Sequence, residues 1–60
     1  MFVRGLRPYT IFALKHNIDT QFVKLFSGNV WCYQGWQEYS PDDFPSNPDD
    51  YVILLHSPSN

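Results

Sequence analysis

The chain has 60 residues, a single cysteine and a net charge of −2, and 18% of its residues are aromatic. This length allows one small domain, and a lone cysteine excludes an intrachain disulfide framework and is typical of a reducing compartment. So short a chain buries only about 60% of the surface that its unfolded form exposes. Aromatic packing, at roughly 150–250 Å² per ring, or self-association must therefore add stability. We expect a folded, cytoplasmic protein.

Neither a membrane span nor a signal peptide is expected. The longest apolar runs, 11–14 and 51–55, are far shorter than the ~20 residues needed to cross a bilayer, and Arg4 and Arg7 interrupt the N-terminus. All four basic residues lie within the first 24 positions, whereas five of the six acids lie in the window 38–50. This asymmetry indicates either a surface directed at a partner or two ends that fold together and partly neutralise each other.

The first half of the chain is predicted to form strands. Residues 9–15 follow Pro8 and are rich in strand-forming side chains, and residues 2–4 are a further candidate strand. A helix within residues 10–26 is the alternative. The apolar residues that recur there at the helical spacings of three and four are Ile11, Leu14, Ile18, Phe22 and Leu25.

The strongest local signal is a β-hairpin. Residues 22–26 and 30–34 are rich in aromatic and β-branched side chains, and a short polar segment separates them. Within that segment, Gly28 followed by Asn29 suits a two-residue type II′ loop, because glycine accepts a positive φ at the first central position.

This loop predicts a register and two faces. Phe26 would lie opposite Trp31, and Lys24 opposite Tyr33. One face would then carry Phe22, Lys24, Phe26, Trp31 and Tyr33, and the other Val23, Leu25, Cys32, Gln34 and Trp36. Both faces are substantially apolar. We therefore expect either that the rest of the chain packs against both faces of the hairpin or that one face contacts a partner.

Residues 37–50 are predicted to form a long, acidic, proline-rich loop. It contains Ser-Pro-Asp-Asp-Phe at 40–44 and Asn-Pro-Asp-Asp-Tyr at 47–51. Such a pattern is typical of a helix N-terminus, in which Ser or Asn caps, Pro fills the first position and the carboxylates face the positive end of the dipole. Pro45 limits the first copy to a turn. A buried strand at 51–56 and a frayed tail at 57–60 follow.

No catalytic or metal-binding pattern is recognisable. Cys32 lies between two aromatic residues, where a thiol behaves as a small buried hydrophobe, and no spacing places His16 or His56 beside it. The aspartates lack the pattern of a calcium loop, and three glycines form no phosphate-binding loop. We expect a protein that is not an enzyme and needs no cofactor or metal.

These observations predict an all-β fold, a small antiparallel meander or partly open barrel of four to five strands. The strands lie near 9–15, 21–27, 30–36 and 51–56. The alternative is an α+β fold with one helix within residues 10–26. Residues 1–60 would form a single small domain.

The expected function is that of a small protein-binding module, an inhibitor or modulator, which docks on a partner with a basic surface. Its acidic, aromatic-rich loop supplies the candidate partner-binding residues: Trp36, Glu38, Tyr39, Asp42, Asp43, Phe44, Asp49 and Asp50.

The sequence also supports two alternative functions. A small nucleic-acid-binding β-barrel would stack bases on an aromatic/Lys face made of Lys24, Trp31 and Tyr33, although four basic residues provide little phosphate neutralisation. A homodimeric structural subunit would bury its second apolar face against another copy.

Overall fold

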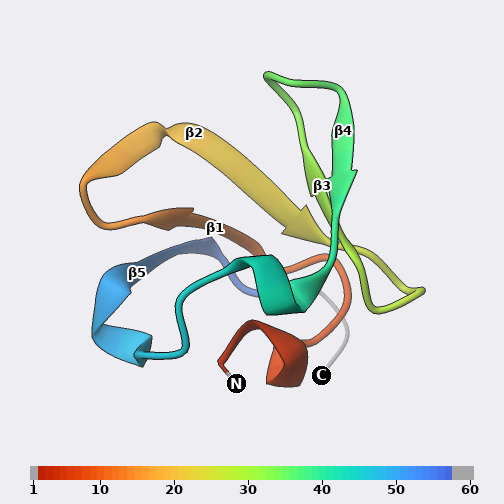
Figure 1. The fold of residues 1–60 in the computed structure, drawn as a ribbon, viewed down its shortest axis with the longest axis horizontal. Coiled ribbons are helices and arrows are strands. Elements are labelled where there is room, and N and C mark those ends of the chain that lie inside the picture. The colour runs from red at the N-terminus through yellow and green to blue at the C-terminus, as the bar shows by residue number, and fades with distance from the viewer. Residues whose placement is uncertain (1, 58–60) are drawn as a thin grey trace.

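The computed structural model describes residues 2–57, and within them five antiparallel strands form one open sheet in the order β4-β3-β2-β1-β5 (Figure 1). The strands are β1 (Ile11–Leu14), β2 (Asn17–Lys24), β3 (Val30–Cys32), β4 (Gln37–Tyr39) and β5 (Tyr51–Leu55). Three 3-10 turns accompany them: η1 (Val3–Gly5), η2 (Pro41–Asp43) and η3 (Pro48–Asp50). The predicted all-β meander is confirmed, and the described residues contain no α-helix.

β1 and β2 occupy the segment for which a helix was the alternative. Phe12 lies opposite Phe22 in the antiparallel pair, and their stacked rings have centroids 5.6 Å apart. Cross-strand aromatic pairs of this kind each stabilise a sheet by roughly 0.2–1 kcal/mol. Strand composition therefore outweighs the helical spacing of the same apolar residues.

The predicted hairpin between β2 and β3 forms, but its register is wrong. Lys24 pairs with Val30 and not with Tyr33. The loop has three residues, 26–28: the Leu25 N–H donates to the Asn29 carbonyl at 2.7 Å, and Gly28 takes the positive φ of 101°. A positive-φ glycine also suits this longer, bulged loop, so the Gly-Asn pair does not distinguish the two turn types.

The corrected register exchanges the faces of β3. Phe22 now shares a face with Cys32, while Val23 lies opposite Trp31 on the other face. The displacement is an odd number of residues, and an odd displacement turns every side chain of a strand over.

β4 lies inside the segment that was predicted to be loop. The chain reverses over 33–36, where Trp36 has a φ of 49°, and Gln37–Tyr39 pairs back onto β3. The strand predicted at 30–36 consequently ends at Cys32. Three polar and aromatic residues are too few to show an alternation in the sequence.

Residues 2–4 do not form the predicted strand. The 3-10 turn η1 brings three carbonyls toward Lys24, whose Nζ donates to the carbonyl oxygens of Val3, Arg4 and Leu6 at 3.0, 3.0 and 2.9 Å. A buried ammonium needs several acceptors, and an extended strand would direct successive carbonyls to opposite sides.

Both Pro-Asp-Asp copies form the predicted capped turns. The Ser40 hydroxyl accepts a hydrogen bond from the Asp42 N–H, and the Asp43 carboxylate accepts one from the Ser40 N–H. The Asn47 side-chain oxygen caps η3 by accepting a hydrogen bond from the Asp49 N–H, and β5 follows directly. The caps are local devices, which explains why the sequence predicts them well.

The core lies on one face of the sheet. Phe12 is fully buried and its ring contacts the rings of Phe22, Phe44 and Tyr51. The buried cluster consists of Val3, Phe12, Phe22, Val30, Cys32 and Tyr51, with Phe44, Tyr39 and four further partly buried side chains packed against it. The aromatic residues thus supply most of the core of this short chain.

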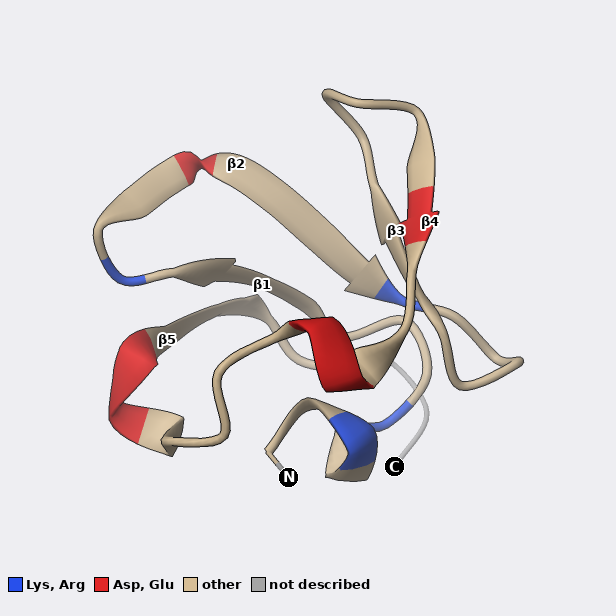
Figure 2. Cartoon of the chain, in the orientation of Figure 1, with Lys and Arg blue, Asp and Glu red and all other residues tan. Residues whose placement is uncertain are grey.

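The basic and acidic parts of the chain meet where η1 lies beside η2 (Figure 2). Arg4 Nη2 lies 2.7 Å from Asp42 Oδ1. Residues 58–60, most of the predicted frayed tail, lie outside the described residues. Across residues 2–57, the structure contains no helix with the length and apolar character of a membrane span.

Candidate protein-binding groove

Two adjoining hollows open where the β1–β2 turn approaches the chain segment after η2. The larger has a volume of about 520 Å³ and is lined by Leu14, Phe22, Gln37, Glu38, Tyr39, Asp43, Phe44 and Pro45. The smaller, of about 240 Å³, is lined by Leu14, Lys15, His16, Asn17, Pro45 and Asp50. Since Leu14 and Pro45 line both hollows, we treat the two as one feature, the acidic groove.

Three aromatic rings wall the larger hollow. Phe22 comes from β2, Tyr39 from β4, and Phe44 follows η2. All three pairs pack edge to face, with centroid separations of 6.2 Å for Phe22–Tyr39, 5.1 Å for Phe22–Phe44 and 6.0 Å for Tyr39–Phe44. Because each ring is held by the two others, the wall exists before any ligand arrives.

Two acidic residues, Glu38 and Asp43, line the larger hollow, and their carboxylates lie in different places. Asp43 is oriented by its capping role, since Oδ2 accepts from the Ser40 N–H at 3.1 Å. Glu38 lies opposite Trp31 in the β3–β4 pair, so its side chain projects from the sheet face opposite Phe22 and Tyr39, where Oε2 accepts from the Asn29 side-chain amide at 2.7 Å. Both donors are neutral, so they orient the carboxylates without cancelling their negative charge.

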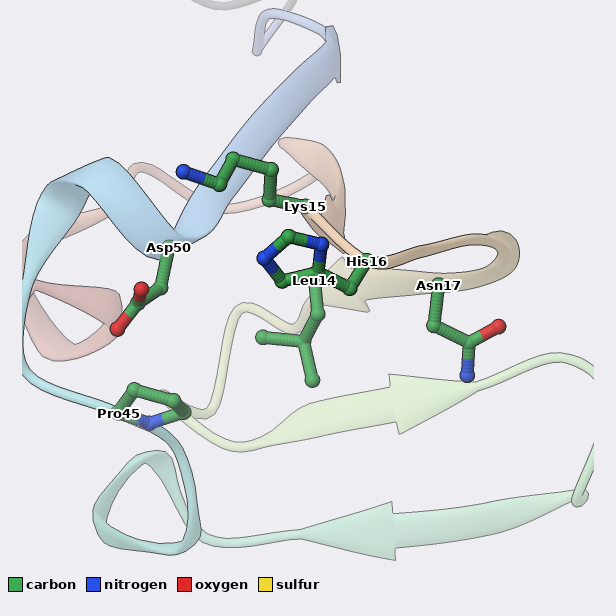
Figure 3. A pocket seen from close by; sticks show the side chains of 6 residues that line it. All are labelled: Leu14, Lys15, His16, Asn17, Pro45 and Asp50. Carbon is green, nitrogen blue, oxygen red and sulfur yellow. The ribbon is translucent and has the colours of Figure 1, made fainter.

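The smaller hollow has a mostly apolar wall with polar groups at its margin. In Figure 3 the His16 ring lies between Lys15 above it and the Leu14 side chain below it, and Asp50 stands above Pro45. The Lys15 N–H donates to the Asp50 carbonyl at 2.8 Å, which ties the β1–β2 turn to η3.

Tyr51 fixes the wall that the two hollows share. Its hydroxyl donates to the Pro45 carbonyl oxygen. Burial raises the pKa of the Tyr51 hydroxyl, and the nearby charge of Asp50 adds to this effect. The phenol therefore keeps its proton for this hydrogen bond at neutral pH.

The structure gathers part of the predicted partner-binding set. Four of those residues line the larger hollow, namely Glu38, Tyr39, Asp43 and Phe44, and Asp50 lines the smaller one. Tyr39 and Phe44 are half-buried, so they act both as anchors of the loop and as walls of the groove. Trp36, Asp42 and Asp49 line neither hollow.

Several groove residues were missed by sequence reasoning. They are Leu14, Lys15, Asn17, Gln37 and Pro45, while Phe22 was assigned to another surface and His16 to a plain turn. The β1–β2 turn and the segment after η2 are far apart in the chain and meet because β5 pairs beside β1. No local sequence pattern indicates this contact, and Pro45 by itself predicts only the end of a turn.

Trp36 lies in the β3–β4 turn and does not line the groove. Its side chain is 79% exposed, and its ring meets Trp31 edge to face at 6.3 Å. Trp36 has a left-handed backbone, which destabilises a non-glycine residue by roughly 1–2 kcal/mol. Its contact with the Trp31 ring stabilises the turn by roughly 0.5–1.5 kcal/mol. These two terms nearly cancel, so the position of Trp36 adds little to stability.

The proposed aromatic/Lys face is divided by the corrected register. Lys24 is 4% exposed and its ammonium is bonded to η1, whereas Trp31 lies on the other face of β3. Tyr33 is exposed in the turn that follows. Burial lowers the pKa of Lys24, and Arg4 lowers it further. The three residues predicted for nucleic acid do not share a surface.

Metal ligands are not gathered in the described part of the chain. Among residues 2–57, no three His, Cys, Asp or Glu side chains form a group that could hold a metal ion. Cys32 is buried and unpaired, and its Sγ lies 3.9 Å from Gln34 Oε1.

Comparison of the chain with protein-family models, with curated proteins and with solved structures finds no match.

Proposed function

We propose that this chain is a non-enzymatic protein-binding module whose acidic groove receives a basic segment of a partner protein. The larger hollow carries the proposal, because three rings from separate elements and the acidic residue Asp43 line one cavity of about 520 Å³. That volume lies within the range of roughly 300–1,000 Å³ typical of ligand sites. A chain that binds without reacting would act on its partner as an inhibitor or modulator.

Charge supports a basic protein segment over nucleic acid. Glu38 and Asp43 at the larger hollow would repel phosphates and speed the approach of a basic surface. Moreover, one of the four basic residues, Lys24, is buried and already bonded to three carbonyls.

The test is affinity capture with matched variants. Tagged wild type and the double variant Glu38→Gln/Asp43→Asn are incubated with nuclease-treated lysate at low and moderate salt, and the retained proteins are identified by mass spectrometry. We expect one stoichiometric partner that wild type retains, that moderate salt releases, and that the double variant does not retain. Asp49→Asn, outside the groove, should behave as wild type. Retention of the same proteins by wild type and the double variant would contradict the proposal.

A homodimer is the second candidate, and one specific observation favours it. β5 is an edge strand without a charged residue, and Val52, Leu54 and Leu55 are 36%, 41% and 57% exposed. Uncharged edge strands tend to pair with other chains. Such a dimer would melt at a temperature that rises with protein concentration, whereas the melting temperature of a monomer would not change.

A cytoplasmic location remains part of the proposal. It is supported by the buried, unpaired thiol of Cys32, since free buried cysteines are typical of reducing compartments.

A further inference from the structure

β5 lies at an edge of the sheet, and among residues 2–57 no strand pairs with its outer side (Figure 1). The Lys15 N–H donates to the Asp50 carbonyl at 2.8 Å, which makes these two residues a hydrogen-bonded pair of the β1–β5 ladder. Such pairs alternate with pairs whose backbone groups point away from each other. Val52 therefore directs its backbone toward Ala13 of β1, whereas Ile53 directs its N–H and its carbonyl outward. The backbone of Ile53 can thus pair with a further strand.

Tyr51 has the same outward orientation, but its N–H is already bonded. It donates to the Pro48 carbonyl where η3 ends. A hydrogen-bonded pair exchanges two bonds, one from the N–H of each residue, so a strand placed opposite Tyr51 would gain only one of them. Beyond Ile53, a register shift interrupts the regular ladder. Ile53 is therefore the position at which an incoming strand gains a complete pair.

The side chains on either side of Ile53 fit a second copy of the same strand. When Ile53 lies opposite Ile53 of a second copy, antiparallel alignment places Val52 of each chain opposite Leu54 of the other. Both side chains project from the sheet face opposite Phe12, since Ile53 shares the face of Phe12 and side chains alternate along a strand. They are 36% and 41% exposed, so this register buries apolar surface that one copy leaves in water.

Charge favours self-pairing through β5 over self-pairing through the opposite edge. A two-fold axis places a strand against itself, and like charges that face each other across a strand pair are destabilising. β4 has Glu38 at its centre, whereas no residue of β5 is charged. Antiparallel pairing also brings the residue before one strand near the residue after the other. Asp50 would therefore lie near His56 of the second copy, which places an acid beside a base.

From these observations we propose that two copies of this chain pair antiparallel through β5, with Ile53 opposite Ile53 at the two-fold axis. The result is one continuous sheet that contains the five strands of each copy. This inference rests on the homodimer candidate, because it specifies the interface of that dimer, and it does not involve the acidic groove. The contact is one short strand from each copy, so we expect a weak dimer that forms at high protein concentration.

Amide hydrogen exchange, followed by NMR on the full chain at low and high protein concentration, tests the interface without any substitution. The Ile53 N–H lacks a β1 partner in one copy and is hydrogen-bonded in the dimer, so its exchange should slow several-fold as the concentration rises. The Val52 N–H faces β1 and is the internal control, since its exchange should be slow at both concentrations. Exchange at Ile53 that is independent of concentration would overturn the inference.

Two matched variants test which side chains face each other. Val52→Lys and Leu54→Glu each place a charge at an exposed position, so both chains should fold, and each alone should dimerise about tenfold more weakly than wild type. A mixture of the two should associate more strongly than either alone, because the register places the introduced lysine opposite the introduced glutamate. Phe26→Lys, at an exposed position outside β5, should dimerise like wild type. Sedimentation equilibrium measures all four samples.

The outcomes separate the interface from the dimer itself. If wild type dimerises and Val52→Lys dimerises equally well, the homodimer candidate stands and the β5 interface is wrong. If the mixed variants associate no better than each alone, the register centred on Ile53 is wrong. If neither the melting temperature nor the exchange at Ile53 depends on protein concentration, both the interface and the homodimer candidate are wrong, and the proposal for the acidic groove is unaffected.

Discussion

Lys24 shows how one side chain determines the path of a distant segment. It lies at the end of β2, yet its ammonium bonds three carbonyls of residues 3–6 and so converts a predicted strand into a turn. The chain as described has no other basic side chain that is buried. The N-terminal segment is therefore attached to the sheet by hydrogen bonds as well as by the packing of Val3.

Replacing Lys24 by Met should separate these two contributions. The variant keeps an apolar stem and leaves the three carbonyls without their donor, so the free energy of unfolding should fall by about 2–3 kcal/mol. Urea denaturation measures this change. Lys15→Met, at an exposed position, should change it by less than about 0.5 kcal/mol. Equal stability of the two variants would show that the ammonium contributes nothing.

Tyr51 makes stability depend on alkaline pH. Its pKa in the folded chain is raised above the ordinary value of 10.0, so the folded state holds a proton that the unfolded state releases. The contribution of this group is complete below pH 10.0 and declines as the pH rises through the folded-state pKa. Lys24 acts in the opposite sense, because its lowered pKa makes stability rise with pH up to 10.5.

Tyr51→Phe isolates the tyrosine. At neutral pH the variant should be about 1 kcal/mol less stable, since it lacks the hydrogen bond to Pro45. The difference from wild type should narrow as the pH rises above 10.0, because only wild type loses the proton. Urea unfolding of both proteins over this range measures it, and the effect of Lys24 cancels in the comparison. A difference that stays constant with pH would contradict the raised pKa.

At the scale of the elements, the β2–β3 loop depends on one glycine. Gly28 has a φ of 101°, and a Cβ there would meet open space, so strain is the only cost of a side chain. Gly28→Ala should therefore lower the free energy of unfolding by about 1 kcal/mol. Gly5→Ala is the control, since Gly5 also has open space and no positive φ. The measurement is thermal or urea unfolding, and equal effects would mean that strain is negligible.

The elements also show what the sequence can and cannot predict. Both capped turns were predicted because Ser40 and Asn47 bond to backbone groups two residues away. The β2–β3 register was not, because a glycine with positive φ fits two loop lengths and only packing chooses between them. β4 is short and polar, and pairing with β3 alone defines it.

The same distinction applies to the groove. Its carboxylates and two of its rings lie in one acidic segment and were predicted. Its remaining walls depend on β5 pairing with β1, a contact between distant parts of the chain. Sequence reasoning thus named several of the residues that line the candidate site and missed its shape.

The whole molecule is sensitive to the loss of one core ring. A chain of this length is expected to have about 3–9 kcal/mol of stability, and Phe→Ala in a core costs about 3–5 kcal/mol. Phe12→Ala should therefore leave a large fraction unfolded at room temperature, visible as collapse of NMR chemical-shift dispersion. Phe26→Ala, at a position 79% exposed, should remain folded. A well-dispersed spectrum for Phe12→Ala would mean that the rings contribute less than their burial indicates.

The hydrogen bond from Tyr51 to Pro45 has a consequence for biosynthesis. Tyr51 begins β5, the last strand among the described residues, whereas every residue that lines the groove precedes it in the chain. A nascent chain that ends before β5 has neither the strand beside β1 nor the hydroxyl that holds Pro45. The groove is therefore assembled only after β5 has been synthesised and has paired with β1, and a ligand of the proposed kind would bind only chains in which this strand is in place.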